Sequence, residues 1–131
     1  MNDDQLQAIS PIDGRYLEKS THLRQYFSES ALMRYRVFTE IKWLIFLSEY
    51  NDLNQIPVLS KDIKGSLEDI IGQFSIDDAK AIKTIENQTN HDVKSIEYFL
   101  QEKINRLPDG NTLIPFIHFG CTSEDINNIS Y

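Results

Sequence analysis

The sequence predicts an all-α protein, because apolar residues recur at helical spacing along most of its 131 residues. Three polar residues stand directly before such stretches and are suited to cap helices: Ser28, Ser75, and Thr122 or its neighbour Ser123. The turn formers Pro108-Asp109-Gly110-Asn111 separate the last long helical stretch from the end of the chain.

The first half of the chain should contain a loop and one long helix. Residues 1–27 mix turn formers with short apolar patches and predict a loop with a brief helix near 23–27. The strongest helix covers 28–50 and ends at Asn51-Asp52. Its inward-facing residues are expected to be Leu32, Tyr35, Val37, Phe38, Ile41, Leu44, Ile45 and Leu47.

Further helices are predicted at 63–71, closed by Gly72, and from Ser75, with Ile76, Ala79, Ile82 and Ile85 inward. The polar residues 87–92 lack helical periodicity and predict a loop, after which a fourth helix runs over about 93–107. Residues 114–119 are expected to be extended or to form a single turn.

The last helix has barely begun when the sequence stops at Tyr131, which predicts that the chain is a piece of a longer protein. We expect an N-terminal helical domain over 1–111, followed at 112–131 by a connection and the first turns of a second domain.

Composition limits the function classes. The residues are 40% hydrophobic and 25% charged, which is ordinary for a soluble protein, and the net charge of −7 argues against nucleic-acid binding. The longest apolar stretch, 43–47, is too short for a membrane span, and the acidic N-terminus is unlike a signal peptide. A single cysteine, Cys121, fits a reducing cytosol, so a cytoplasmic protein without a membrane partner is expected.

The first segment with chemical potential is Ser10-Pro11-Ile12-Asp13-Gly14-Arg15-Tyr16. Its Pro and Gly favour a turn that presents Arg15, whose planar fork of donors suits phosphate or carboxylate, and Tyr16, which adds a hydroxyl. The alternative is a surface turn with a solvated Arg.

The second segment is Thr89-Asn90-His91-Asp92-Val93, at the start of the fourth helix. Amides at a helix start can hold an anion, and His91 can titrate near neutral pH. Asp92 is placed either to orient the ring of His91 or to raise its pKa. In the alternative, Asn90 or Asp92 is simply the helix cap and His91 is a loop residue.

The third segment runs from Cys121 to Asn128. Thr122 and Ser123 place two hydroxyls at a helix start, which favours a carboxylate site, although Thr122 paired with Asp125 would serve equally as a cap. The adjacent Asn127 and Asn128 are poor helix formers and tip the balance towards function.

Several features argue against other chemistry. The sequence has no Gly-rich phosphate loop, and His91 has no second His or Cys at metal-ligand spacing, so no metal is expected. His22 and His118 stand alone and are expected to be structural. Cys121 precedes a helix start that can lower its pKa, but no neighbouring His supports a catalytic thiol.

Together these segments resemble the bacterial adenylosuccinate lyases. The resemblance rests on SPIDGRY (10–16), KTIENQTNHDVKSIEYFLQEK (83–103) and FIHFGCTSEDINN (116–128), in that order and spacing, and it extends over essentially the whole chain. It implies the all-α fold of the fumarase/aspartase superfamily, with this chain ending where the central helical bundle begins.

The resemblance also implies an activity. The family are carbon–nitrogen lyases of purine biosynthesis that release fumarate from adenylosuccinate, giving AMP, and from the related succinyl-carboxamide nucleotide SAICAR, giving AICAR. They need no cofactor or metal, and they are homotetramers whose active sites combine residues from different subunits.

By the same resemblance, Arg15 and Tyr16 bind the nucleotide, and Asn90, His91 and Asp92 belong to the substrate site, with His91 as an auxiliary catalytic group. Thr122 and Ser123 are expected to hold the substrate through an oxygen of its succinyl part. The family's principal acid, a His, and its principal base, a Ser on a mobile loop, would lie beyond residue 131, so this chain alone is expected to be inactive.

Two alternatives stay open from the sequence. One is another lyase of the same superfamily, such as argininosuccinate lyase, fumarase or aspartase, although the Asn90-His91-Asp92 segment argues against it. The other is a non-catalytic helical interaction domain, in which the three polar segments are only caps and turns.

Overall fold

A computed structural model describes residues 1–50 and 52–131, and within these ranges the chain forms helices and turns without any strand. The all-α prediction is confirmed. The chain divides into two compact units, residues 1–32 and 33–131, and the boundary falls within helix α4 (Glu29–Glu49). The long helix was predicted to end at Asn51-Asp52, and Asn51 lies outside the described residues. The predicted domain boundary at 111–112 stays a prediction.

The first unit consists of short helices joined by turns. These are α1 (Asp3–Leu6), α2 (Leu17–Ser20), the 3₁₀ turn η1 (Thr21–Leu23) and α3 (Arg24–Phe27). The brief helix predicted near 23–27 is confirmed as α3. Helices α1 and α2 have four residues each, too few to produce a helical period in the sequence, and were therefore missed.

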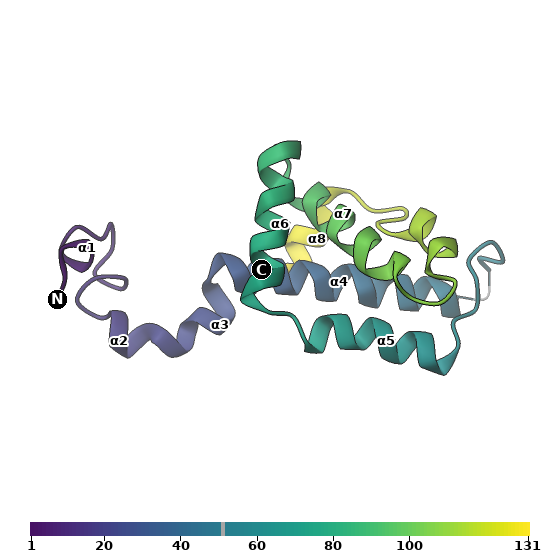
Figure 1. Cartoon of the computed structure of the whole chain (residues 1–131), viewed down its shortest axis with the longest axis horizontal. Coiled ribbons are helices and arrows are strands. Elements are labelled where there is room, and N and C mark those ends of the chain that lie inside the picture. Colours follow the sequence, from purple (N-terminus) through teal and green to yellow (C-terminus); the bar gives the residue numbers. More distant parts are fainter. Residues whose placement is uncertain (51) are drawn as a thin grey trace. The chain divides into compact units, whose positions relative to one another are not determined.

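The second unit is built from α4, α5 (Lys61–Gly72), α6 (Ile76–Thr89), α7 (Asp92–Asn105) and α8 (Ser123–Ser130). In Figure 1, the axes of α4, α5 and α7 are roughly aligned, with α5 running opposite to α4 and α7, whereas α6 stands across them. The four longer helices share one hydrophobic core, which the turns η2 (Gly110–Thr112) and η3 (Ile114–Phe116) adjoin. Its fully buried residues include Val37, Ile41, Leu44, Leu67, Ile82, Ile96, Leu100 and Ile104.

The predicted helix caps are present. The hydroxyl of Ser28 accepts a hydrogen bond from the amide of Ala31, and Ser75 and Asp78 bond to each other across the first turn of α6. These bonds satisfy amides that have no partner within the helix, so they fix where α4 and α6 begin.

Some predictions from periodicity were wrong. Most of the loop predicted at 87–92 is helical. Helix α6 continues to Thr89 and stops only where Asn90 adopts a left-handed conformation (φ 52°), and α7 begins at Asp92. Phe38 and Ile76, expected inside, are exposed, and Ile76 is the first residue of α6. For residues 114–119, the single-turn alternative is confirmed: 114–116 form η3, and the residues after it are in turns.

Within the described residues, no helix combines the length and the apolar character that a bilayer span requires.

Candidate functional site

In the first unit, residues 10–16 form the compact turn that the sequence predicted. The amides of Asp13 and Gly14 both donate to the carbonyl of Ser10, and the amide of Tyr16 donates to that of Pro11. A Cβ at Gly14 would lie 2.6 Å from the carbonyl oxygen of Gln5, so only glycine fits there. The turn leaves Arg15 and Tyr16 exposed, ready to meet a ligand or another surface.

The α7 start, residues 90–94, joins two helices through a single left-handed residue. Asn90 ends α6, and its amide donates to the carbonyl of Glu86. His91 is the cap of α7: its Nδ1 accepts the amide hydrogen of Lys94 at 3.1 Å. The predicted alternatives, Asn90 or Asp92 as the cap, were wrong, because the imidazole nitrogen takes the place of the usual side-chain oxygen.

This cap determines how His91 presents itself. Because Nδ1 is an acceptor, the neutral ring is assigned its proton at Nε2, which makes that nitrogen a donor. The side chain is about half exposed, at 51% of its surface, so the ring is accessible to a ligand.

Asp92 is engaged elsewhere. Its Oδ2 lies 2.7 Å from Nη2 of Arg36, and its Oδ1 accepts from the amide of Val93 at 2.8 Å. Oδ1 is 3.7 Å from Nδ1 of His91, too far for a hydrogen bond. The expectation that Asp92 orients the ring was therefore wrong, since the amide of Lys94 performs that task.

The α8 start, residues 122–125, is more open. The carboxylate of Asp125 accepts from the amide of Thr122 at 2.7 Å and from its hydroxyl at 3.0 Å. These two bonds hold the pKa of Asp125 below its usual value, and the Thr122–Asp125 cap considered from the sequence is present. The amides of Ser123 and Glu124 and the hydroxyl of Ser123 have no partner in residues 1–50 and 52–131. Three donors are thus available at this helix start.

Arg36, which the sequence analysis did not single out, connects the two starts. It projects from α4 and is almost fully buried, with Nη2 bonded to Asp92 and Nε bonded at 2.9 Å to Oδ1 of Asn127 on α8. Asn127 therefore serves the packing of α8 rather than a ligand. In the sequence, Arg36 could have been noticed as a charged residue next to Val37, on the side of α4 that faces the core.

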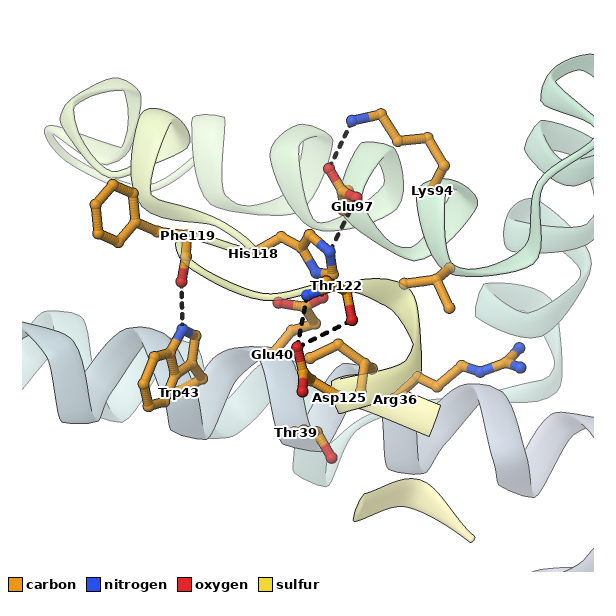
Figure 2. Close-up of polar contacts among 12 residues, drawn as sticks. Arg36, Thr39, Glu40, Trp43, Lys94, Glu97, His118, Phe119, Thr122 and Asp125 are labelled. Carbon is orange, nitrogen blue, oxygen red and sulfur yellow. Dashed lines mark hydrogen bonds and ion pairs between the residues drawn. The ribbon is translucent and has the colours of Figure 1, made fainter. Parts of the chain in front are cut away.

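A second cluster lies one helical turn further along α4. The buried Glu40 contacts Nδ1 of His118, while Nε2 of His118 faces Glu97 at 3.9 Å (Figure 2). Glu97 in turn pairs with Lys94 at 2.7 Å. His118 is thus held within the fold, as the sequence suggested, but by charged partners that the sequence analysis did not identify.

Cys121 is not activated. Burial raises the pKa of its thiol, and the nearby carboxylates of Glu40 and Asp125 raise it further, so the expected lowering by the helix start was wrong. No group of three or more His, Cys, Asp or Glu among the described residues is placed to hold a metal ion.

The second unit therefore brings together two of the three predicted segments. The α7 start presents His91, the α8 start presents Ser123, and both are fixed to α4 through Arg36. Arg15 and Tyr16 belong to the first unit and form a turn of their own. What the second unit offers is an imidazole and free helix-start donors, a combination that suits an anionic ligand undergoing proton transfer.

Comparison with known proteins identifies the family of the chain. A family model described as lyase matches residues 14–131, and the chain belongs to this lyase family. It is 48% identical over 126 residues to the adenylosuccinate lyase of Escherichia coli K12 and equally similar to that of Legionella pneumophila strain Philadelphia 1. It is 44% identical over 131 residues to the adenylosuccinate lyase of Buchnera aphidicola subsp. Schizaphis graminum.

The first two matches cover 96% of this chain but 28% of the relative, and the third covers all of this chain and 29% of the relative. The chain thus corresponds to somewhat over a quarter of these enzymes.

Proposed function

We propose that this chain forms the N-terminal part of an adenylosuccinate lyase, which releases fumarate from adenylosuccinate to give AMP and from SAICAR to give AICAR. The observation that carries this proposal is the pair of helix starts held by Arg36, one with an accessible imidazole and the other with free donors. The near 50% identity to adenylosuccinate lyases supports the choice of substrate.

The substrate carries a phosphate and two carboxylates, so fixed donors are needed to neutralise them. At the α8 start, the hydroxyl and amide of Ser123 and the amide of Glu124 supply donors for a carboxylate of the succinyl group. Thr122 contributes by fixing this start through Asp125. Arg15, with its five-donor fork, and Tyr16 bind the nucleotide part from the first unit's turn.

The elimination needs a base that takes a proton beside a carboxylate and an acid that protonates the leaving nitrogen. The negative charge that grows on that carboxylate is stabilised by donors placed in advance, which is the role we propose for the α8 start. We propose that His91 is an auxiliary group that polarises or protonates the substrate through its Nε2–H. Asn90 and Asp92 complete this part of the site, Asp92 by fixing the α7 start through Arg36.

The principal acid and base are proposed to lie in the part of the enzyme that this chain does not cover. The purified chain is then expected to release no fumarate, and measurable fumarate release by it would contradict this division of labour. The complete enzyme is proposed to be a cytoplasmic homotetramer with shared active sites and without a metal or cofactor.

A chimera tests the proposal directly. The chain would replace the matching N-terminal segment of the Escherichia coli adenylosuccinate lyase, and fumarate release from adenylosuccinate and SAICAR would be followed. Activity supports the proposal, whereas a chimera that is folded by circular dichroism yet inactive on both substrates contradicts it. Parallel assays with argininosuccinate, malate and aspartate separate it from other lyases of the superfamily.

A helical interaction domain is the second candidate, and one observation favours it. A groove of about 560 Å³ runs beside α4 and α8, with the aromatic side chains of Phe38, Trp43 and Phe46 and the apolar Ile126 and Ile129 in its walls. Exposed apolar surface of this kind is typical of protein interfaces. The reading frame discriminates: a stop codon after Tyr131 favours the interaction domain, and a downstream His-bearing helix with a Ser-bearing loop favours the enzyme.

A further inference from the structure

Glu40 is a carboxylate in an unusual place. It lies in the middle of α4 with 1% of its surface exposed, next to the core residues Val37, Ile41 and Leu44. Removing a carboxylate from water is costly unless it is paired and hydrogen-bonded. Burial raises the pKa of Glu40, and the contact with His118 opposes that rise. Such a residue calls for a reason beyond packing.

The partner of Glu40 is equally unusual. His118 has φ of 61°, a left-handed conformation that a residue with a Cβ seldom adopts without support from its surroundings. Its Nδ1 lies 2.5 Å from Oε1 of Glu40, and its Nε2 lies 3.9 Å from Oε1 of Glu97. Both ring nitrogens thus face carboxylates from two different helices, α4 and α7, and these contacts hold the ring inside the fold.

The turn that contains His118 leads directly into the α8 start. The carbonyl of His118 accepts the amide hydrogen of Cys121 at 3.2 Å, and the amide of the next residue, Thr122, donates to Asp125. One turn along α4 from Glu40, the indole of Trp43 donates at 2.8 Å to the carbonyl of Phe119 (Figure 2). Two side chains of α4 therefore bond to two consecutive residues of this turn.

We propose that Glu40 is a positioning residue that, by clamping His118 in its left-handed conformation, fixes the geometry of the α8 start at Thr122 and Ser123. Other charged groups share this environment: Lys94 pairs with Glu97, and Asp125 and the thiol of Cys121 lie close enough to interact electrostatically with His118 and Glu40, respectively. Glu40 differs from them because it is the buried acid in contact with the strained residue itself.

The test separates positioning from general stability by where the chain loosens. Removing one partner of a buried pair leaves the other unpaired, so Glu40→Met should lower the melting temperature. If Glu40 positions the turn, amide hydrogen exchange should rise about tenfold more at Cys121 and Thr122 than at the amides of α5 and α6.

A spectroscopic signature accompanies this change. In the unmodified chain, NMR should detect a slowly exchanging ring proton on Nδ1 of His118, and this signal should vanish in Glu40→Met. Glu49→Met is the matched control, because it makes the same substitution on the same helix at an exposed ion pair with Lys64. It should leave both the ring signal and the exchange at Cys121 unchanged.

The outcomes are decisive in either direction. Exchange at Cys121 and Thr122 within about twofold of the unmodified chain would overturn the proposal, and so would a uniform rise along the chain, which reports general destabilisation. If Glu40→Met does not fold, Glu40→Leu decides by the same criterion, because it also removes both acceptor oxygens from the ring of His118.

The consequence for catalysis rests on the proposed function and is tested separately. In the chimera, Glu40→Met should lower kcat/KM for adenylosuccinate about tenfold, as the loss of supporting partners does at other sites. An inactive parent chimera would refute the lyase proposal while leaving the exchange result, which requires no substrate, to decide the role of Glu40.

Discussion

Helices α7 and α8 both begin with a polar cap residue and an acidic first turn, yet their starts offer different chemistry. At the α7 start, the amides of Val93 and Lys94 are bonded to Asp92 and His91, so these two backbone donors are used and the accessible group is a ring. At the α8 start, the carboxylate of Asp125 bonds back to Thr122, and the amide of Asp125 is bonded to Thr122 in return. The amides of Ser123 and Glu124, and the hydroxyl of Ser123, have no partner within the described residues.

The difference shows that capping and binding are not exclusive alternatives. Both caps satisfy the third amide of their helix, but Asp92 also takes the second amide of α7, whereas Asp125 bonds back to the cap residue and leaves the first two amides of α8 available. The α7 start is therefore suited to proton transfer and the α8 start to anion binding. Arg36, bonded to both helices, makes them parts of one arrangement.

Removing the side chain of Arg36, which connects the two helix starts, should have the largest effect of the changes proposed. Arg36→Ala leaves Asp92 and the amide oxygen of Asn127 without their partner, and we expect the free energy of unfolding to fall by about 3 kcal/mol. Urea denaturation measures it. The control is Arg106→Ala, which breaks an exposed ion pair with Glu102 and should cost less than about 1 kcal/mol. Equal losses in the two variants would show that Arg36 does not join the helix starts.

Removing the imidazole of His91, at the α7 start, should have the second-largest effect. His91→Asn keeps a side-chain acceptor for the amide of Lys94 and removes the ring, so the helix should stay capped. In the chimera, we expect kcat/KM for adenylosuccinate to fall about 100-fold, within the range of lost acid–base assistance. His22→Asn, an exposed histidine in the first unit, is the control and should have no effect. A change below threefold for His91→Asn would remove this residue from the mechanism.

The open donors of the α8 start should matter somewhat less per group. Ser123→Ala removes one hydroxyl that has no partner in the described chain, so stability should not change. If the hydroxyl bonds a substrate carboxylate, kcat/KM should fall about tenfold, the value expected for one hydrogen bond to a charged group. Steady-state kinetics of the chimera measure this, and an unchanged kcat/KM would assign Ser123 to the surface.

The smallest effect is expected for the Thr122–Asp125 cap of α8, and it should depend on pH. The pKa of Asp125 is held below its ordinary 3.8 by the amide and hydroxyl of Thr122, so ionised Asp125 stabilises the folded state. This contribution is fully present above pH 3.8 and is lost as the pH falls through the lower pKa of the folded protein. Asp125→Asn should therefore lower the melting temperature at pH 7 and make less difference in stronger acid. A difference independent of pH would contradict this origin.

Much of the fold followed from the sequence, because long helices with clear apolar faces and Ser or Thr caps leave a strong local signal. The helices α4, α5, α6 and α7 were expected close to where they lie. The errors have local causes. Helix α1 is too short to show a period, and the end of α6 depends on the left-handed Asn90, which periodicity does not reveal.

The site was predicted less completely, because its supports are contacts between distant parts of the chain. Arg36 meets residues 56 and 91 positions away, and Glu40 meets His118 78 positions away. No local pattern encodes such pairs. The one usable sign was the presence of charged residues on the inner side of an otherwise apolar helix, where burial demands a partner.

One measurement tests the central claim most directly: a crystal structure of the chimera with AMP and fumarate, the two products, bound. The account predicts that ligand atoms lie within hydrogen-bond distance of both the ring of His91 and the hydroxyl or amide of Ser123. Ligands that contact only one of these two helix starts, or neither, would contradict it.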